Sequence, residues 1–369
     1  MKDSKTGVGV VGCGNISALY LRTLQRFPAL EVRACADLDA NAARAQAEAF
    51  NIPKACSTDE LVNDPEISIV VNITPPPVHA PVAEKALRAG KSVYNEKPIA
   101  TTREDAKRLI GLAKEKGLRL GSAPDTFLGG GMQTMRKLVD EGLIGEPVAA
   151  TACLMSRGPE LWHPNPDSYY KTGSGPLLDT GPYAVTCLVN LLGPVRRVSG
   201  MARTTFPERT IASGPRAGRK VRVETPTLVM ATLEFASGAL GDLITSFDTW
   251  PGKLPPLEVF GTEGTLHGPS PALFGGEIEH SPLGKKEWRP VPLGFAYVDK
   301  LRGLGVADMA AAIRSGRPHR ASAEMAYHVL DVLVGILESA ESGRTVEIES
   351  ACERPAPMIA GLPEWTVDE

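Results

Sequence analysis

Short apolar runs alternate with amphipathic stretches over residues 6–121, and this alternation is typical of a parallel sheet covered by helices. The expected strands are Gly7–Val11, Leu30–Ala36, Ile67–Ile73, Ser92–Asn95 and Leu118–Gly121. The expected helices are Ile16–Arg26, Ala40–Phe50, one that opens at Ser57–Leu61, Val78–Ala89 and Thr102–Lys116. Because strands and helices alternate so regularly, we expect one doubly wound α/β domain here.

Beyond residue 124, strand-like stretches separated by Gly and Pro turns predict a large, mostly antiparallel open sheet. The expected strands are Pro147–Leu154, Val195–Thr204, Thr227–Phe235, Leu240–Thr249, Leu257–Phe260 and Gly264–Leu266. The expected helices are Met132–Glu141, Gly173–Leu192, Ala307–Ser315 and Ala323–Ser342. The polar, Pro-rich segment 207–220 is expected to be a loop. We therefore predict an α/β protein with domains at 1–123 and 124–349, followed by a Pro-rich C-terminal tail at 350–369.

Composition and charge exclude several classes of protein. Among 369 residues, 40 Lys and Arg stand against 43 Asp and Glu, so the basic excess of a nucleic-acid binder is missing. No apolar run reaches the roughly 18 residues of a membrane helix, and the start MKDSKTGVGVV has no secretory pattern. The six cysteines form no C-x-x-C pair, and the histidines lack metal-ligand spacing. We expect a cytoplasmic globular enzyme or sensor with no metal and no nucleic-acid or membrane partner.

A glycine turn follows the first expected strand. Gly12 permits a tight turn, and Gly14 lets the backbone approach a pyrophosphate at the start of a helix that opens with Asn15 and Ile16. Asp37 ends the second strand, where its carboxylate can accept hydrogen bonds from ribose hydroxyls and repel a 2′-phosphate. This pattern predicts a Rossmann dinucleotide-binding domain at 1–123 that prefers NAD to NADP. A glycine turn without a ligand is the alternative.

A lysine stands just beyond the fourth expected strand, in the triplet Glu96-Lys97-Pro98. Ligands of open α/β sheets bind at the carboxyl ends of the strands, so Lys97 is a candidate functional residue. An exposed Glu–Lys turn without a ligand would have the same sequence, because charged pairs are common on protein surfaces. Position alone leaves both interpretations open.

Together, the glycine turn, the segment ITPPPVH at 73–79 and the triplet at 96–98 resemble the Gfo/Idh/MocA oxidoreductases. The resemblance extends to the segment 173–183 and to the end of the last expected helix. It implies a Rossmann domain followed by an α/β domain whose open sheet often forms the oligomer interface, and hence a homodimer or homotetramer.

The same resemblance implies which residues meet the cofactor and the substrate. The expected cofactor contacts, besides the glycine turn and Asp37, are Thr74, Pro75, His79, Glu96 and Lys97.

In the family, the lysine of the Glu-Lys-Pro triplet lies beside the nicotinamide and the substrate hydroxyl, which is Lys97 here. Asp179 matches an aspartate that faces the substrate, and Tyr183 stands where many members carry histidine. We expect Lys97 to be the principal acid/base, with Tyr183 as its partner and Asp179 as the residue that positions the substrate or Lys97. Which of Lys97 and Tyr183 takes the proton stays open. The segment 124–127 departs from the family pattern and is expected to change the pocket wall.

An aromatic stretch leads into the segment that holds Asp179. Trp162, His163 and Tyr170 offer ring faces and hydrogen-bonding groups, a mixture that suits a sugar ring, and we expect them to contact substrate. Asp248 and Trp250, at the end of an expected strand, are weaker candidates for the same pocket.

We therefore expect an NAD-dependent dehydrogenase that acts on a secondary hydroxyl of a sugar, cyclitol or glycoside. An NAD-dependent glycosidase or epimerase, which oxidises its substrate transiently with no net redox change, is the first alternative. A non-catalytic sensor of NAD or sugar is the second.

Overall fold

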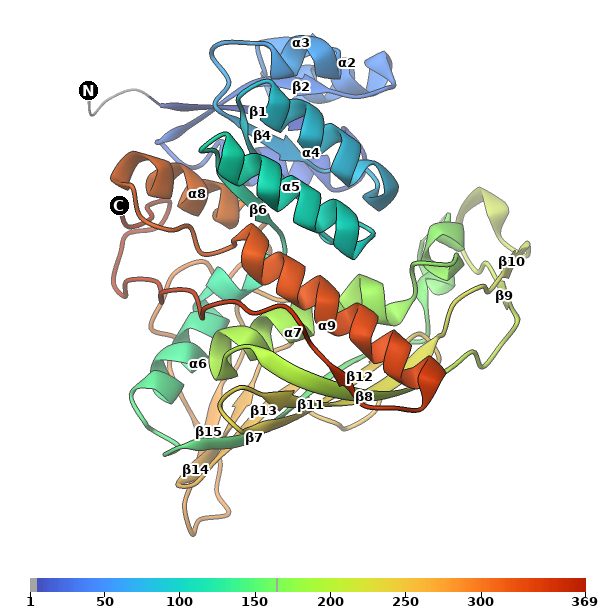
Figure 1. Ribbon diagram of the computed structural model, residues 1–369, viewed down its shortest axis with the longest axis vertical. Coiled ribbons are helices and arrows are strands. Elements are labelled where there is room, and N and C mark those ends of the chain that lie inside the picture. The colour runs from blue at the N-terminus through green and yellow to red at the C-terminus, as the bar shows by residue number, and fades with distance from the viewer. Residues whose placement is uncertain (1–4, 164) are drawn as a thin grey trace. The chain divides into compact units, whose positions relative to one another are not determined.

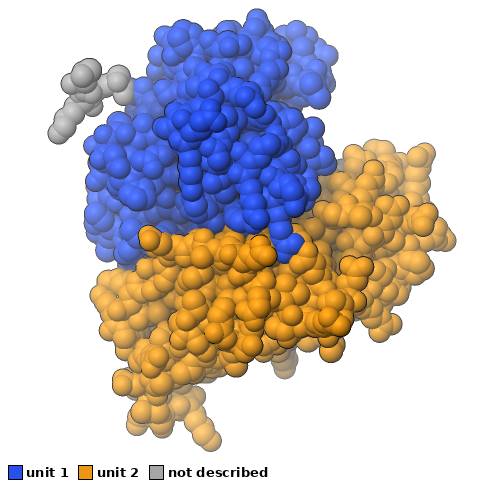
Figure 2. Space-filling view, in the orientation of Figure 1, with its two compact units in different colours: residues 1–130, 294–327, 355–369 blue, residues 131–293, 328–354 orange. Residues whose placement is uncertain are grey.

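The computed structural model describes residues 5–163 and 165–369 (Figure 1). Its chain forms two compact units, which are coloured separately in Figure 2. The first contains the chain up to Gly130 together with 294–327 and 355–369, and the second contains 131–293 and 328–354. A division into consecutive stretches at residue 123 therefore does not describe the first unit, because two later segments return to it.

The first unit is built on a parallel sheet of six strands in the order β3-β2-β1-β4-β5-β6. Its strands are β1 (Thr6–Val11), β2 (Leu30–Ala36), β3 (Lys54–Cys56), β4 (Ile69–Asn72), β5 (Ser92–Asn95) and β6 (Leu120–Ser122). Its helices are α1 (Ser17–Leu24), α2 (Ala40–Ala49), α3 (Thr58–Val62), α4 (His79–Arg88), α5 (Arg103–Glu115) and α8 (Leu304–Ser315). Helix α4 lies beside α5 (Figure 1). Helix α1 packs against α8.

Local sequence explains these elements. Strand β4 reads IVVN and is buried along its whole length, as a strand covered on both faces must be. Ser57 caps α3 in a capping box with Glu60, and the Thr102 side chain accepts from the Asp105 backbone at the start of α5. The predicted α/β fold of this part is confirmed. The short strand β3 was not predicted from the sequence, because it is only three residues long.

A buried arginine is one of the residues that tie the C-terminal tail to the rest of the first unit. Arg320 donates to the carboxylates of Asp308 on α8 and Asp368 in the tail, and to the Pro357 carbonyl at 2.8 Å. The Trp365 ring packs edge-on against Phe27, with ring centroids 5.3 Å apart. Residues 355–369 contain no regular helix or strand, and these contacts make them part of the first unit.

The second unit is built on a mixed sheet of nine strands in the order β16-β15-β14-β13-β7-β12-β11-β8-β17, in which only β12 and β7 run parallel. Its strands are β7 (Pro147–Met155), β8 (Val195–Arg203), β11 (Leu228–Phe235), β12 (Leu240–Ser246), β13 (Leu257–Gly261), β14 (Gly264–Gly268), β15 (Glu279–Pro282), β16 (Arg289–Pro290) and β17 (Val346–Glu347). Helix α7 (Pro176–Leu192) packs against β7, β11 and β12. Helices α6 (Gly130–Asp140) and α9 (Ala323–Ser342) run from the first unit into the second. The predicted large, mostly antiparallel sheet is confirmed.

The prediction of a loop at 207–220 is wrong in part. Strands β9 (Glu208–Thr210) and β10 (Lys220–Arg222) pair there as a separate antiparallel ribbon. Val221 of β10 and Ile211, which directly follows β9, pack in a small core with Tyr170 and Phe247. Each strand has only three residues, too few to reveal the alternation of apolar and polar positions in the sequence.

Within residues 5–163 and 165–369, no group of three His, Cys, Asp or Glu could hold a metal ion. No helix of the described chain is both long and apolar enough to cross a membrane.

Candidate functional site

The carboxyl ends of four strands meet at one edge of the six-stranded sheet. Val11 of β1 pairs with Ala36 and Asn72, and Asn72 pairs with Asn95 of β5. The residues that follow these strands therefore share one edge. Strand order reverses between β1 and β4, which is where dinucleotides bind in such sheets. Three strand spacings of about 4.8 Å separate β2 from β5, so the strand ends that precede Asp37 and Glu96 lie about 14 Å apart.

The glycine turn leaves β1 at this edge. Gly12 has a φ of +106°, and a Cβ built there would lie 2.8 Å from the backbone carbon and oxygen of Ile73. A Cβ built on Gly14 would have no neighbour within 4 Å. Ser17 follows on α1 and donates from its hydroxyl to the Gly14 carbonyl at 2.6 Å. Gly12 thus serves the close approach of two chain segments, whereas Gly14 faces open space.

Asp37 is tied to that turn. Its Oδ2 accepts from the Cys13 backbone N–H at 2.7 Å, and its Oδ1 accepts from the Asp39 backbone N–H at 2.9 Å. The side chain is half-buried, and Asn15 in the turn is exposed. An open cradle at Gly14 beside a fixed carboxylate fits a dinucleotide, whose pyrophosphate requires backbone approach and whose ribose requires an acceptor.

His79 links two loops at the same edge. Its Nδ1 lies 2.7 Å from the Pro98 carbonyl and its Nε2 lies 2.7 Å from the Thr74 carbonyl. Burial lowers the pKa of His79, and a neutral imidazole has one N–H to donate to one of the two carbonyls. His79 is fully buried, whereas Pro75 is exposed. The buried His79 side chain therefore links the two loops, and residues of the loops themselves form the exposed surface at this edge.

Two buried asparagines at this edge were not found from the sequence. Asn72 donates to the Asn95 side-chain oxygen and to the His79 carbonyl, both at 3.0 Å. Asn95 donates to the Ile99 carbonyl at 2.9 Å, beyond the triplet that holds Lys97. Asparagine at the end of a buried strand is the signal that could have identified them, since a buried amide requires partners.

Glu96 orients the backbone of Lys97. Its Oε2 accepts from the Lys97 backbone N–H at 2.8 Å, and its Oε1 accepts from the Tyr20 hydroxyl at 2.9 Å. Glu96 is buried and Lys97 is half-buried. Both carboxylate oxygens of Glu96 are thus engaged inside the protein, and Lys97 is the residue of the pair with a partly exposed surface.

In the second unit, Asp179 and Tyr183 lie on α7. They are four residues apart, so they share one face of the helix, and both are half-buried. Between them, Gly181 lies against α9, where a Cβ would come within 2.7 Å of the Leu333 side chain. Asp179 and Tyr183 therefore lie on one side of α7, and Gly181 between them allows α7 and α9 to pack closely.

Three of the aromatic residues before α7 contact one another. The ring centroids of Trp162 and His163 are 5.4 Å apart, and those of His163 and Tyr169 are 5.3 Å apart. Trp162 is 64% exposed. Tyr170 is fully buried, and its hydroxyl donates to the Glu160 carboxylate, so it presents no surface to a substrate in this structure.

Two further residues have buried partners where a pocket wall was expected. Asp248 forms an ion pair with Arg209 and accepts from the Thr227 hydroxyl at 2.7 Å. Asp125 is fully buried and accepts from the backbone of Gly303 at 2.8 Å and of Gly305 at 3.0 Å, at the start of α8. Burial raises the pKa of Asp125. The segment 124–127 is therefore buried, and its effect on a pocket wall stays a prediction.

Comparison with known proteins gives the family. Residues 6–123 match the model of the oxidoreductase family with an NAD-binding Rossmann fold, and residues 132–267 match the Gfo/Idh/MocA C-terminal domain. The chain is 29% identical over 299 residues to trans-1,2-dihydrobenzene-1,2-diol dehydrogenase of Mus musculus, covering 78% of this chain and 81% of that protein. It is 28% identical over 287 residues to levoglucosan dehydrogenase of Pseudarthrobacter phenanthrenivorans, covering 70% and 72%.

A crystal structure of an NAD-binding oxidoreductase from Klebsiella pneumoniae superimposes with a TM-score of 0.81 at 26% identity, over 94% of this chain and 99% of that one. The likeness therefore covers both units. Because models of both domains of one family match, the chain belongs to the Gfo/Idh/MocA oxidoreductases, whose Rossmann domain binds NAD.

Proposed function

We propose that this protein is an NAD-dependent dehydrogenase that oxidises a secondary hydroxyl of a sugar, cyclitol or glycoside. The observation that carries the proposal is the sheet edge on which the turn at Gly14, the carboxylate of Asp37 and the loop of Lys97 follow aligned strands. Relatives named levoglucosan dehydrogenase and inositol 2-dehydrogenase support a polyhydroxylated substrate.

Residues of the first unit would hold the cofactor. Gly12 and Gly14 would admit its pyrophosphate, and Asp37 would accept from its ribose hydroxyls. The Asp37 carboxylate also supports NAD over NADP, because it would repel a 2′-phosphate. When bound, NAD supplies the acceptor for a hydride. The fixed backbone of Lys97, held by Glu96, would keep the lysine at the nicotinamide end of this edge.

Oxidation of an alcohol also requires a group that removes the hydroxyl proton. We assign this role to the Lys97 amine, with the Tyr183 hydroxyl as its partner and the Asp179 carboxylate as the group that positions a neighbouring hydroxyl or Lys97. The family resemblance of these three positions supports the assignment. The shared helix face of Asp179 and Tyr183 supports their joint action.

The rings of Trp162 and His163 would contact the substrate. An aromatic face packs against the C–H face of a sugar, and an imidazole donates to or accepts from its hydroxyls. The exposed ring of Trp162 beside His163 offers both.

We further propose that the protein forms a homodimer or homotetramer through the nine-stranded sheet. Alternate residues of β11 are buried, while Met230 is 50% exposed and pairs across strands with Met201, which is 81% exposed. Exposed methionines on an open sheet face support an interface there.

The test is the absorbance of reduced nicotinamide with NAD and then NADP across sugars, inositols and glycosides. We expect steady NADH formation with one substrate group, and with NAD rather than NADP. Product formation without NADH accumulation would instead indicate an enzyme with no net redox change. Bound NAD with no turnover of any compound would indicate a sensor.

A further inference from the structure

One buried arginine joins three segments of the second unit. Nη1 of Arg209 donates to Oε1 of Glu160 at 3.0 Å, and its Nη2 donates to the Phe247 carbonyl at 2.9 Å. Nη2 also forms an ion pair with Asp248, two residues beyond the end of β12. The three charged side chains are 3%, 4% and 5% exposed for Arg209, Glu160 and Asp248. The buried guanidinium of Arg209 is thus held by two carboxylates and one backbone carbonyl.

Aromatic rings and a second cation complete the cluster. The Arg209 guanidinium lies 4.8 Å from the Phe206 ring centroid and 5.8 Å from that of Tyr170. Arg157 lies 3.8 Å from Glu160 and stacks on the Phe206 ring at 5.0 Å. Two arginines therefore balance the two carboxylates of Glu160 and Asp248, and removal of one member leaves a buried charge without its partner.

Glu160 and Tyr170 bracket the segment that carries Trp162, His163 and Tyr169. Arg209 pairs with Glu160 at the start of this segment, and Tyr170 at its end donates its hydroxyl to the same Glu160 carboxylate. Both ends of the segment are therefore attached to one guanidinium–carboxylate pair.

We infer that Arg209 is a positioning residue that sets the rings of Trp162 and His163 for the substrate by pinning both ends of the segment 160–170. This inference rests on the proposed function, in which those rings contact the sugar. Nothing in the sequence marks Arg209, because the polar segment 207–220 also contains Arg216, Arg219 and Lys220.

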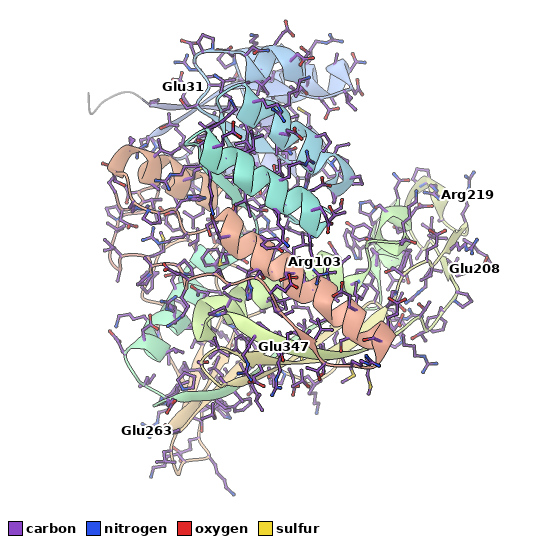
Figure 3. All side chains as sticks on the ribbon, in the orientation of Figure 1. Glu31, Arg103, Glu208, Arg219, Glu263 and Glu347 are labelled. Atoms are coloured by element: carbon purple, nitrogen blue, oxygen red, sulfur yellow. The ribbon has the colours of Figure 1, made fainter. Side chains whose placement is uncertain are left out.

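The geometry requires arginine and not merely a positive charge. A guanidinium presents donors in a rigid planar fork, so it reaches Glu160, Asp248 and a carbonyl at once, whereas an ammonium is a compact point charge on a flexible stem. Arg209→Lys therefore keeps the charge balance of the cluster but loses part of the bridging. Arg219 precedes β10 on the same ribbon, is exposed and is labelled in Figure 3, so Arg219→Lys is the matched control.

The first experiment measures kcat and KM for the best sugar from the substrate panel, and the Kd for NAD. We expect Arg209→Lys to raise KM for the sugar by about tenfold or more, as small displacements of positioning groups do. The kcat at saturation and the Kd for NAD should stay within about twofold, and Arg219→Lys should match the wild type. The variant Trp162→Ala with His163→Ala should raise KM at least as much, and adding Arg209→Lys to it should raise KM no further, because Arg209 acts through these two rings.

The second experiment needs no substrate. Hydrogen–deuterium exchange of the holoprotein should show faster uptake in peptides from 157–172 for Arg209→Lys, with unchanged uptake in β1 and α1. If Arg209→Lys does not fold, Arg209→Met with Glu160→Gln removes one cation and one anion together and keeps the cluster neutral; we expect the same faster exchange. Unchanged exchange, or a KM increase that adds to that of the variant lacking both rings, overturns the inference. If the wild type oxidises no sugar, the proposed function fails, while the exchange data still decide whether Arg209 holds the segment.

Discussion

Gly12 and Gly14 lie two positions apart, and substitution by alanine should affect protein stability at the first and NAD binding at the second. At Gly12, a Cβ would meet the Ile73 backbone at 2.8 Å, and the residue has a φ of +106°. The backbone conformation costs about 1–3 kcal/mol for a residue other than glycine, and the forced shift of the neighbouring strand end costs about 1–3 kcal/mol more. Gly12→Ala should therefore lower the free energy of unfolding by about 2–6 kcal/mol.

At Gly14, a Cβ would meet nothing within 4 Å. The free energy of unfolding of Gly14→Ala should therefore lie within about 1 kcal/mol of the wild-type value. That same open space is where we expect the pyrophosphate, so the Kd for NAD should rise at least about tenfold, or about 1.4 kcal/mol. At an NAD concentration of about 100 times the wild-type Kd, NAD should stabilise the wild type by about 2.7 kcal/mol and Gly14→Ala by about 1.4 kcal/mol or less.

Thermal unfolding without NAD measures the stability of each variant, and unfolding with NAD measures the stabilisation by the cofactor. Isothermal titration calorimetry supplies the Kd for NAD. A Gly14→Ala protein that folds normally and binds NAD as tightly as the wild type would refute the assignment of the cradle. A Gly12→Ala protein as stable as the wild type would refute the steric reasoning from the structure.

Three further changes test other parts of the account. Asp37→Ala should raise the Kd for NAD by about tenfold and bring the Kd for NADP closer to it in calorimetry, because the ribose acceptor and the repulsion are lost together; unchanged values for both cofactors would contradict this role. In the fold, burial lowers the pKa of His328, and the Val195 backbone N–H donates to its Nε2 at 2.9 Å, so the folded ring is neutral. Below about pH 6.5 the unfolded state then binds more protons, and the free energy of unfolding in urea should fall between about pH 6.5 and pH 5, with a smaller fall in His328→Gln; equal slopes would exclude His328 as a cause. Met230→Lys should shift the sedimentation coefficient toward that of the monomer, because it places a charge beside Met201 on the exposed sheet face; an unchanged oligomer would place the interface elsewhere.

Local patterns predicted most of the regular elements. Strands β2 and β5 begin and end where the sequence indicated, because apolar, β-branched and aromatic residues stand between clear turns. Helix α9 also has the expected bounds, since its apolar positions keep a helical period over twenty residues. The pairing of β9 with β10 depends on a core that Tyr170 and Phe247 complete from elsewhere in the chain, and no local pattern shows this.

The candidate site divides in the same way. The place of Gly12, Gly14 and Asp37 at one sheet edge could be predicted, because it follows from their positions relative to a strand and a helix. The roles of Tyr170 and of Arg209 could not, because burial and charge pairing depend on contacts between distant segments. The sequence around Tyr170 would be the same whether its side chain pointed inward or outward.

The most direct test of the proposed dehydrogenase compares wild-type protein with Lys97→Met in a single turnover. Excess enzyme and NAD are mixed with the sugar from the panel, and the absorbance of reduced nicotinamide is followed while calorimetry gives the Kd for NAD. The account predicts one equivalent of NADH per sugar in the wild type, and a rate at least about a hundredfold lower in Lys97→Met with an unchanged Kd for NAD. NADH formation by Lys97→Met at the wild-type rate would contradict the account.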